Sequence, residues 1–206
     1  MKRVLLSRWT KVVLFLACLI PAADLAWKVY QGNLANPVEY ITHTTGDWII
    51  RFLLITLSVT PLRMILNQPQ LTRFRRMFGL FAFAYGMVHF ATWFWLDKAL
   101  DFSEMGKDVV KRPFITAGMT GLALMIPLAI TSTAGWVRRL GFKRWQALHR
   151  LVYVSATAGV IHYYWLVKSD VRLPLMYAGI LAVLLGYRVV ARVRKKTPVV
   201  RVAETV

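Results

Sequence analysis

Six long apolar stretches, separated by short polar segments, dominate the pattern of positions along the chain. Each is close to the ~20 residues that a helix needs to cross a hydrocarbon core, whereas membrane-barrel strands are shorter and alternate. The pattern predicts an all-α polytopic membrane protein, built as a six-helix transmembrane bundle. The expected spans are residues 9–30, 48–66, 74–96, 114–133, 148–167 and 173–193.

Composition agrees with a membrane protein. The 206 residues are 57% apolar and 17% charged, against roughly 25% charged residues in a soluble domain. The first stretch also has the order of a signal peptide, with a basic start, an apolar run and small residues at 21–23. Apolarity resumes after Asp24, and Trp27 and Tyr30 are typical interface anchors. We therefore expect a retained helix.

Basic residues are sorted between alternate connections. If the N-terminus is inside, 19 of the 27 Lys and Arg residues are inside, and eight of the nine acids are outside. The positive-inside rule then predicts that both termini of this multi-pass protein are cytoplasmic. Basic segments beside a membrane attract anionic lipid. Their spread over four connections excludes a nucleic-acid-binding module.

The chain reads as one transmembrane domain, residues 1–196, followed by a short cytoplasmic tail, residues 197–206. Its two longest connections are both on the outer side: QGNLANPVEYITHTTGD and DKALDFSEMGKDVVKRP. The second has the spacing of a short amphipathic surface helix that a partner outside can bind. A solvated loop is the alternative.

Two of the four histidines bracket the fifth apolar stretch. His149 and His162 lie 13 residues apart, about 20 Å along a helix, which suits two haems stacked across the bilayer. On a straight helix their rings point about 140° apart. Two haems on this helix therefore need different directions of approach or a local bend, which Ser155 or Gly159 permits.

Depth in the membrane pairs two of these histidines. His89 lies eight residues before Asp97, and His162 lies eight before Asp170, so both rings sit ~9–12 Å below the outer boundary. They are expected to share one iron. The alternative for each histidine is a structural polar contact.

The inner site is expected to use His149, which is level with Arg75, Arg76 and Met77 on the third span. The arginines are expected to bind haem propionates, and Met77 either ligates or packs. His43 precedes Thr44, Thr45 and Asp47, which are typical helix-start residues, so a cap or loop role is favoured over a ligand role.

Other cofactor chemistry is limited by what the sequence lacks. There is no CxxCH for covalent haem, so the haem expected is b-type. There is also no nucleotide-binding motif and no HExxH. Cys18 is the only cysteine, so no intrachain disulfide forms, and it is expected to pack as a small apolar residue.

Several short segments, in order, carry a family resemblance: HTTGDW, TPLR, RRMFGL, VHF, KRPFITAG, TST, LGFKRWQALHRLVY and IHYYWLVK. Through them the chain resembles the haem-binding membrane subunits of bacterial periplasmic methionine sulfoxide reductase systems, in the ferric-reductase-like transmembrane family. The resemblance covers nearly the whole chain and implies a multi-pass protein of the bacterial inner (cytoplasmic) membrane. It implies that His89, His149 and His162 ligate haem iron. It also implies bound FMN, for which no motif is visible, so any flavin sits on the basic inner face or arrives with another protein.

The expected function is electron transfer without a substrate-reducing site of its own. Electrons enter from quinol or reduced flavin, supplied by the quinone pool or a cytoplasmic flavin reductase, and cross one or two b-type haems. The resemblance implies that they reach a periplasmic, molybdenum-containing catalytic subunit that repairs methionine sulfoxide. The alternatives are a surface ferric reductase-like cytochrome, or a non-redox membrane scaffold or transporter with structural histidines.

Overall fold

The computed structural model describes the backbone of residues 7–196 and the side chains of residues 7–194, so the tail expected at residues 197–206 lies outside the described part. No strand occurs in residues 7–196, and the prediction of an all-α membrane protein is confirmed. The helices are α2 (Arg8–Tyr30), α3 (Pro37–Ile65), η1 (Pro69–Leu71), α4 (Thr72–Ala91), η2 (Thr92–Asp97), α5 (Phe102–Lys111), α6 (Pro113–Ile130), α7 (Ala134–Leu140), α8 (Phe142–Leu148), α9 (Leu151–Leu166) and α10 (Arg172–Lys196).

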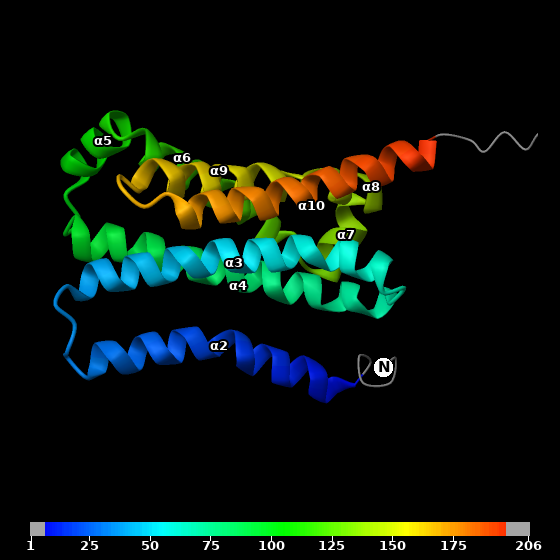
Figure 1. Ribbon diagram of the computed structural model, residues 1–206, viewed down its shortest axis with the longest axis horizontal. Coiled ribbons are helices and arrows are strands. Elements are labelled where there is room, and N and C mark those ends of the chain that lie inside the picture. Colours follow the sequence, from blue (N-terminus) through cyan, green and yellow to red (C-terminus); the bar gives the residue numbers. More distant parts are fainter. Residues whose placement is uncertain (1–6, 197–206) are drawn as a thin grey trace, which may run out of the picture.

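The long helices α2, α3, α4, α6, α9 and α10 run back and forth between two ends of the molecule (Figure 1). We call these the α5 end, where α5 lies, and the α7 end, where α7 and α8 lie. Helix α2 begins and helix α10 ends at the α7 end (Figure 1). This arrangement agrees with an even number of passes, and the cytoplasmic position of the α7 end stays a prediction.

Within the described residues, five helical segments are long and apolar enough to cross a membrane, namely α2, α3, α4 with η1 and η2, α6 and α10. Helix α9 has 16 residues, slightly fewer than the ~17–25 of a usual membrane helix. The span expected at 148–167 is therefore wrong at its start, because α8 ends at Leu148 and α9 begins at Leu151. The six-span count stays a prediction.

The bend in this pass also lies elsewhere than expected. The chain turns at His149 and Arg150, whereas α9 continues unbroken through Ser155 and Gly159. The Ser155 hydroxyl donates to the carbonyl of Gly121 at 2.8 Å and ties α9 to α6. Ser155 therefore joins two helices, and it does not bend one.

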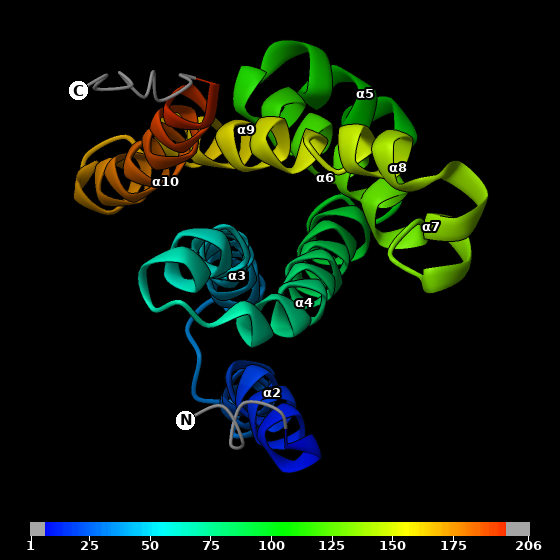
Figure 2. The ribbon, with the colours of Figure 1, turned by 90° about the vertical axis from the view of Figure 1, so that its right-hand side faces the viewer.

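Apolar side chains of α3, α4, α6, α9 and α10, with Cys18 of α2, form the core. Figure 2 shows these helices from the α7 end of the molecule. Phe52 lies between Phe81 and Tyr85, with ring centroids 5.7 and 5.3 Å away. The Tyr85 hydroxyl donates to the carbonyl of Cys18 at 3.1 Å and attaches α2 to the bundle. The Cys18 side chain is buried in this core, so its expected role as a packed apolar residue is confirmed.

Helix α3 begins 11 residues before the expected span. Asn36 caps it, because its side-chain oxygen accepts from the Glu39 amide at 3.2 Å, and Pro37 occupies the first turn. His43 therefore lies inside α3, and the expectation of a cap or loop role for it is wrong. The capping signal was present in the sequence as Asn36–Pro37, within a segment interpreted as a loop.

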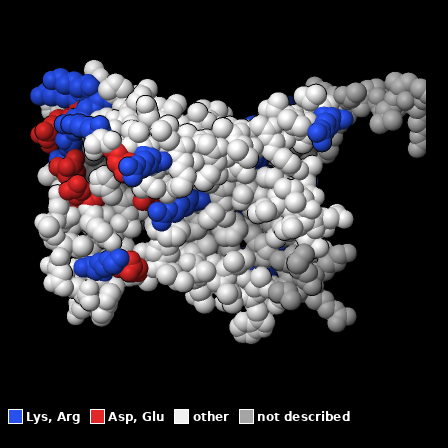
Figure 3. Space-filling view, viewed as in Figure 1, with Lys and Arg blue, Asp and Glu red and all other residues white. Residues whose placement is uncertain are grey.

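The amphipathic helix expected in the second long connection is α5, so the loop alternative is wrong. Its Asp108 is buried and pairs with Lys98 at 2.6 Å, while Phe102 and Val110 are exposed. The Lys98 ammonium beside Asp108 holds the pKa of that carboxyl below its usual range. On the face that Figure 3 shows, the acidic side chains gather at this end of the molecule.

The connection between α6 and α9 contains two short helices, α7 and α8, that the sequence pattern did not reveal. Thr133 caps α7 by accepting from the Trp136 amide at 3.4 Å. Gly141 separates α7 from α8 with φ of +73°, a value that glycine adopts without strain. These two helices place Trp145 and His149 at the α7 end.

Candidate functional site

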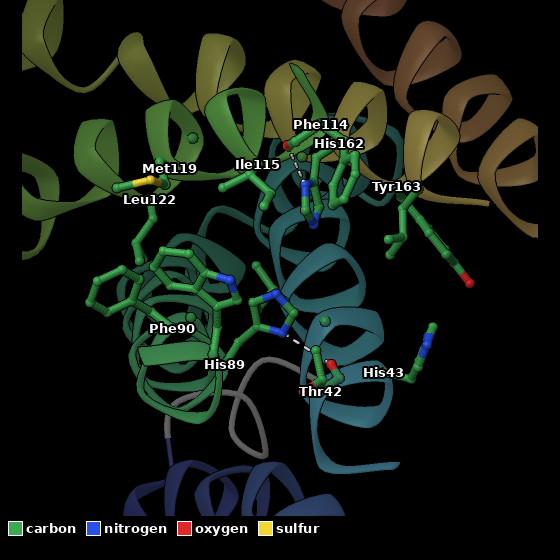
Figure 4. Close-up of a pocket in the computed structure, with 18 of the residues that line it drawn as sticks. Thr42, His43, His89, Phe90, Phe114, Ile115, Met119, Leu122, His162 and Tyr163 are labelled. Atoms are coloured by element: carbon green, nitrogen blue, oxygen red, sulfur yellow. Dashed lines mark hydrogen bonds between the residues drawn. The ribbon is translucent and has the colours of Figure 1, made fainter. Parts of the chain in front are cut away.

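A cavity of about 610 Å³ opens at the α5 end between α3, α4, α6 and α9. This volume lies within the ~300–1,000 Å³ of small-molecule and cofactor sites. Its lining is mainly apolar and includes Phe90, Ile115, Met119 and Leu122 (Figure 4). Such a lining suits a large, flat, apolar ligand.

Two imidazoles face each other across this cavity. The ring centroids of His89, from α4, and His162, from α9, are 6.2 Å apart, and the ring planes meet at 88°. One nitrogen of each ring points toward the other ring (Figure 4). The structure thus brings together the two histidines expected at one depth, and their ligation of iron stays a prediction.

The other nitrogen of each ring is hydrogen-bonded to a backbone carbonyl. His89 Nδ1 lies 3.0 Å from the Thr42 oxygen, and His162 Nδ1 lies 2.6 Å from the Phe114 oxygen. A carbonyl only accepts, so Nδ1 carries the proton in both rings and Nε2 keeps its lone pair. Both Nε2 atoms are therefore available as metal ligands.

These residues fit haem. Two imidazoles that ligate one metal at about 2 Å through Nε2 have ring centres about 6 Å apart, which matches the 6.2 Å observed. Haem needs at most two axial ligands from protein. A bare ion needs more, and no cluster of three His, Cys, Asp or Glu side chains that could hold one occurs in the described part of the chain. Arg112 is the only Lys or Arg among the described residues lining the cavity, and its guanidinium lies 3.3 Å from Asp108.

The mouth of the cavity is polar. Asp47 and Tyr163 line it, and Arg51 connects this region to α10 through hydrogen bonds to Asp47 at 3.5 Å and to the Tyr177 hydroxyl at 3.0 Å. His43 also lines the mouth, is exposed, and lies 3.9 Å from Glu39. His43 thus borders the cavity but does not join the histidine pair.

The segment after His89 departs from α-helical geometry. Residues Thr92–Asp97 form a π-helix, η2, a rare form that is frequent at functional sites. Trp93 and Leu96 from this segment line the cavity. No signal in the sequence distinguishes this turn from a continuing α-helix, so the pattern of apolar positions missed it.

The α7 end holds the remaining histidine in a different setting. His149 Nε2 lies 3.1 Å from the Thr131 hydroxyl oxygen, and that hydroxyl donates to the Pro127 carbonyl at 2.6 Å. The hydroxyl oxygen therefore accepts a hydrogen bond from the Nε2–H group. The His149 ring stacks on Trp145 with centroids 4.1 Å apart.

The structure brings some of the other inner-site residues toward His149. Arg75 is near enough to interact with it electrostatically, whereas Arg76 is exposed. Met77 is buried in the hydrophobic core with 7% of its surface exposed. Packing, and not ligation, is therefore the role that the structure gives to Met77.

Two comparisons place the chain among known proteins. Residues 45–160 match the model of the ferric reductase like transmembrane component. The protein-methionine-sulfoxide reductase heme-binding subunit MsrQ of Herminiimonas arsenicoxydans is 53% identical over 182 residues, which are 87% of this chain and 84% of that one.

Two further relatives carry the same name. The MsrQ of Azospira oryzae is 50% identical over 91% of this chain and 82% of its own length. The MsrQ of Caulobacter vibrioides is 48% identical over 86% of this chain and 85% of its own length. With a membrane-type helical bundle, two facing histidines and these matches, the chain belongs to the ferric reductase like transmembrane family, in the group formed by the MsrQ proteins.

Proposed function

We propose that this chain is the membrane electron-transfer subunit of a protein-methionine-sulfoxide reductase, with a b-type haem between His89 and His162. The observation that carries the proposal is the facing pair of imidazoles at 6.2 Å, each with a free Nε2. The names of the relatives, which describe heme-binding subunits of such reductases, support it.

When bound, haem supplies a reversible one-electron couple. His89 and His162 would hold its iron, and the carbonyls of Thr42 and Phe114 fix both rings in the tautomer that leaves Nε2 free to ligate. Arg112 would pair with a propionate at the mouth of the cavity. The apolar lining excludes water from the ring faces.

The α7 end is the proposed entry side for electrons. His149 would ligate a second haem, and Arg75 and Arg76 would pair with its propionates or with the phosphate of FMN. Quinol or reduced flavin would donate there. In the structure the Nε2 of His149 is bound to Thr131, so ligation through this atom requires that hydrogen bond to open.

The α5 end is the proposed exit side. A periplasmic, molybdenum-containing catalytic subunit would receive electrons there, because α5 presents exposed Phe102 and Val110 beside the haem cavity. The bias of Lys and Arg toward the segments of the α7 end supports this orientation in the inner membrane. A periplasm-dependent reporter fused to the C-terminus is expected to be silent, and activity would reverse the orientation.

The test of the haem assignment is optical. The purified, haem-replete protein is expected to show a Soret band, to be reduced by dithionite, and to release its haem into acidified acetone. A haem-per-chain assay then separates one haem from two. A protein without a Soret band after expression with added haem precursor would remove the electron-transfer proposal and leave the scaffold or transporter alternative.

A further inference from the structure

Each of the two facing imidazoles lies against a glycine of a neighbouring helix. A Cβ placed on Gly118 would lie 2.7 Å from His162 Nδ1, and one placed on Gly46 would lie 3.2 Å from His89 Cε1. The first distance is shorter than real Cβ contacts, and the second requires its neighbour to shift by a few tenths of an ångström. Alanine at either position therefore displaces an imidazole.

The same glycines stand four residues after the carbonyls that accept from the two rings, Thr42 for His89 and Phe114 for His162 (Figure 4). In an α-helix the carbonyl of residue i already accepts the amide of residue i+4, and its second lone pair is open. Because Cβ atoms tilt toward the helix N-terminus, a side chain at i+4 would cover that lone pair. Glycine leaves it accessible to Nδ1.

We propose that Gly46 and Gly118 are positioning residues for the axial histidines. Each forms a backbone docking site with the carbonyl four residues before it, and the two docking sites together direct both Nε2 atoms to one metal. They also set the angle between the imidazole planes, which is 88°. This inference rests on the proposed function, because it concerns the orientation of the ligands assigned there.

Helix α3 and helix α6 carry the two docking sites in the same form, a carbonyl and a glycine four residues later. The α3 site acts on a histidine of α4, and the α6 site acts on a histidine of α9. Each ligand is thus oriented by the helix that pairs with its own helix, and the two rings are fixed independently. Rotation of either ring would change both the Nε2 direction and the interplanar angle.

The test compares Gly118→Ala and Gly46→Ala with Gly79→Ala in the full-length protein. Gly79 lies in α4 against Thr56 of α3, and a Cβ there meets its nearest atom at 3.7 Å, an ordinary contact. Haem affinity is expected to fall about 10- to 100-fold in Gly118→Ala, as when the hydrogen-bonded support of a ligating histidine is removed. A smaller fall is expected in Gly46→Ala and none in Gly79→Ala.

Spectroscopy separates positioning from folding. The haem that remains in the two variants is expected to show a changed electron paramagnetic resonance anisotropy and a shifted midpoint potential, with unchanged helical circular dichroism. Imidazole added to His162→Gly is expected to restore the low-spin spectrum. It is also expected to restore it in His162→Gly combined with Gly118→Ala, because a free ring can move away from the new methyl group.

Three outcomes overturn the inference. The first is a parent-like resonance spectrum and potential in both Gly46→Ala and Gly118→Ala. The second is failure of imidazole in the double variant but not in His162→Gly, since the alanine then acts on the fold or on haem itself. The third is a Gly79→Ala defect equal to the others. Failure of the proposed function is distinct, because it appears in the histidine variants as haem that survives without them.

Discussion

At the α5 end two imidazoles face each other across a cavity, whereas at the α7 end a single imidazole, that of His149, lies against Trp145. The pair at the α5 end is bound to carbonyls through Nδ1, which leaves Nε2 free. His149 is bound through Nε2 to a hydroxyl. The two ends therefore differ in which ring nitrogen is hydrogen-bonded. A histidine bonded through Nδ1 can ligate a metal through Nε2, whereas one bonded through Nε2 must first give up that bond.

Removal of a histidine is the largest expected change. His89→Ala and His162→Ala are expected to lose the same haem, and the double variant is expected to add little, because the two residues act as a unit. His149→Ala is expected to affect a different haem, or none at the α5 end. Reduced-minus-oxidised spectra and haem per chain measure this. A defect shared by His89→Ala and His149→Ala, but not by His162→Ala, would contradict the pairing.

The next largest expected change is the weaker attachment of α5 when its buried ion pair is removed. Asp108→Asn removes the carboxylate that pairs with Lys98 at 2.6 Å and with Arg112 at 3.3 Å, and leaves the buried Lys98 3.8 Å from Asp97. It is expected to weaken the attachment of α5 by about 1–3 kcal/mol, the range for a buried polar group that loses its partner. Amide hydrogen exchange within α5 measures the change. Asp97→Asn is the control, because that carboxylate is half exposed and such pairs contribute little. Equal effects of the two variants would refute the role of the buried pair.

Acid should reproduce this release. The folded protein holds the pKa of Asp108 below its usual value of 3.8, because Lys98 stabilises the charged form. The contribution of the pair to stability is therefore fully present above that pH and is lost as the pH falls through the lowered pKa. The protection factors of the α5 amides, which are corrected for the intrinsic pH dependence of exchange, are expected to fall only below pH 3.8 in the parent protein, and to be insensitive to pH in this range in Asp108→Asn.

The smallest expected change concerns the α7 end. Thr131→Val removes the acceptor of His149 Nε2 and is expected to cost about 1 kcal/mol of stability, while freeing Nε2 for a second haem. A rise in haem per chain with an unchanged α5-end spectrum would show that the hydrogen bond to Thr131 limits haem binding at the α7 end. Thr45→Val, next to His89 Nδ1 at 3.3 Å, is the control, because the Thr42 carbonyl remains as acceptor. If the parent protein holds one haem, an unchanged haem content in Thr131→Val would make His149 a structural residue.

The helical class, most of the spans and the pairing of His89 with His162 could be predicted because each depends on distances along one helix. Apolar length predicts a membrane helix, and the rise per residue places His89 and His162 at one depth. The turn at His149 was not predicted in this way, because apolar residues stand on both sides of it, Leu148 before and Leu151 after, and the two polar residues between them fall within the same expected span.

The contacts that orient the histidines were also beyond sequence reasoning. Gly46 and Gly118 are two of 12 glycines, and nothing in the local pattern marks them as neighbours of an imidazole. Their significance depends on which helix packs against which, α3 against α4 and α6 against α9. That pairing is a property of the folded bundle, and the order of residues alone does not contain it.

Because α9 is short, the membrane next to it is expected to be thinner than an average bilayer. Its 16 residues rise about 24 Å, less than the hydrocarbon core of an average bilayer, about 30 Å thick. Lipids meet such a mismatch by thinning, at a fraction of a kcal/mol per Å. The lipid leaflet at the α7 end should therefore be thinner beside the arginines and tryptophans of α7 and α8. A change in the acyl-chain length of the surrounding lipid should affect the protein at this side alone.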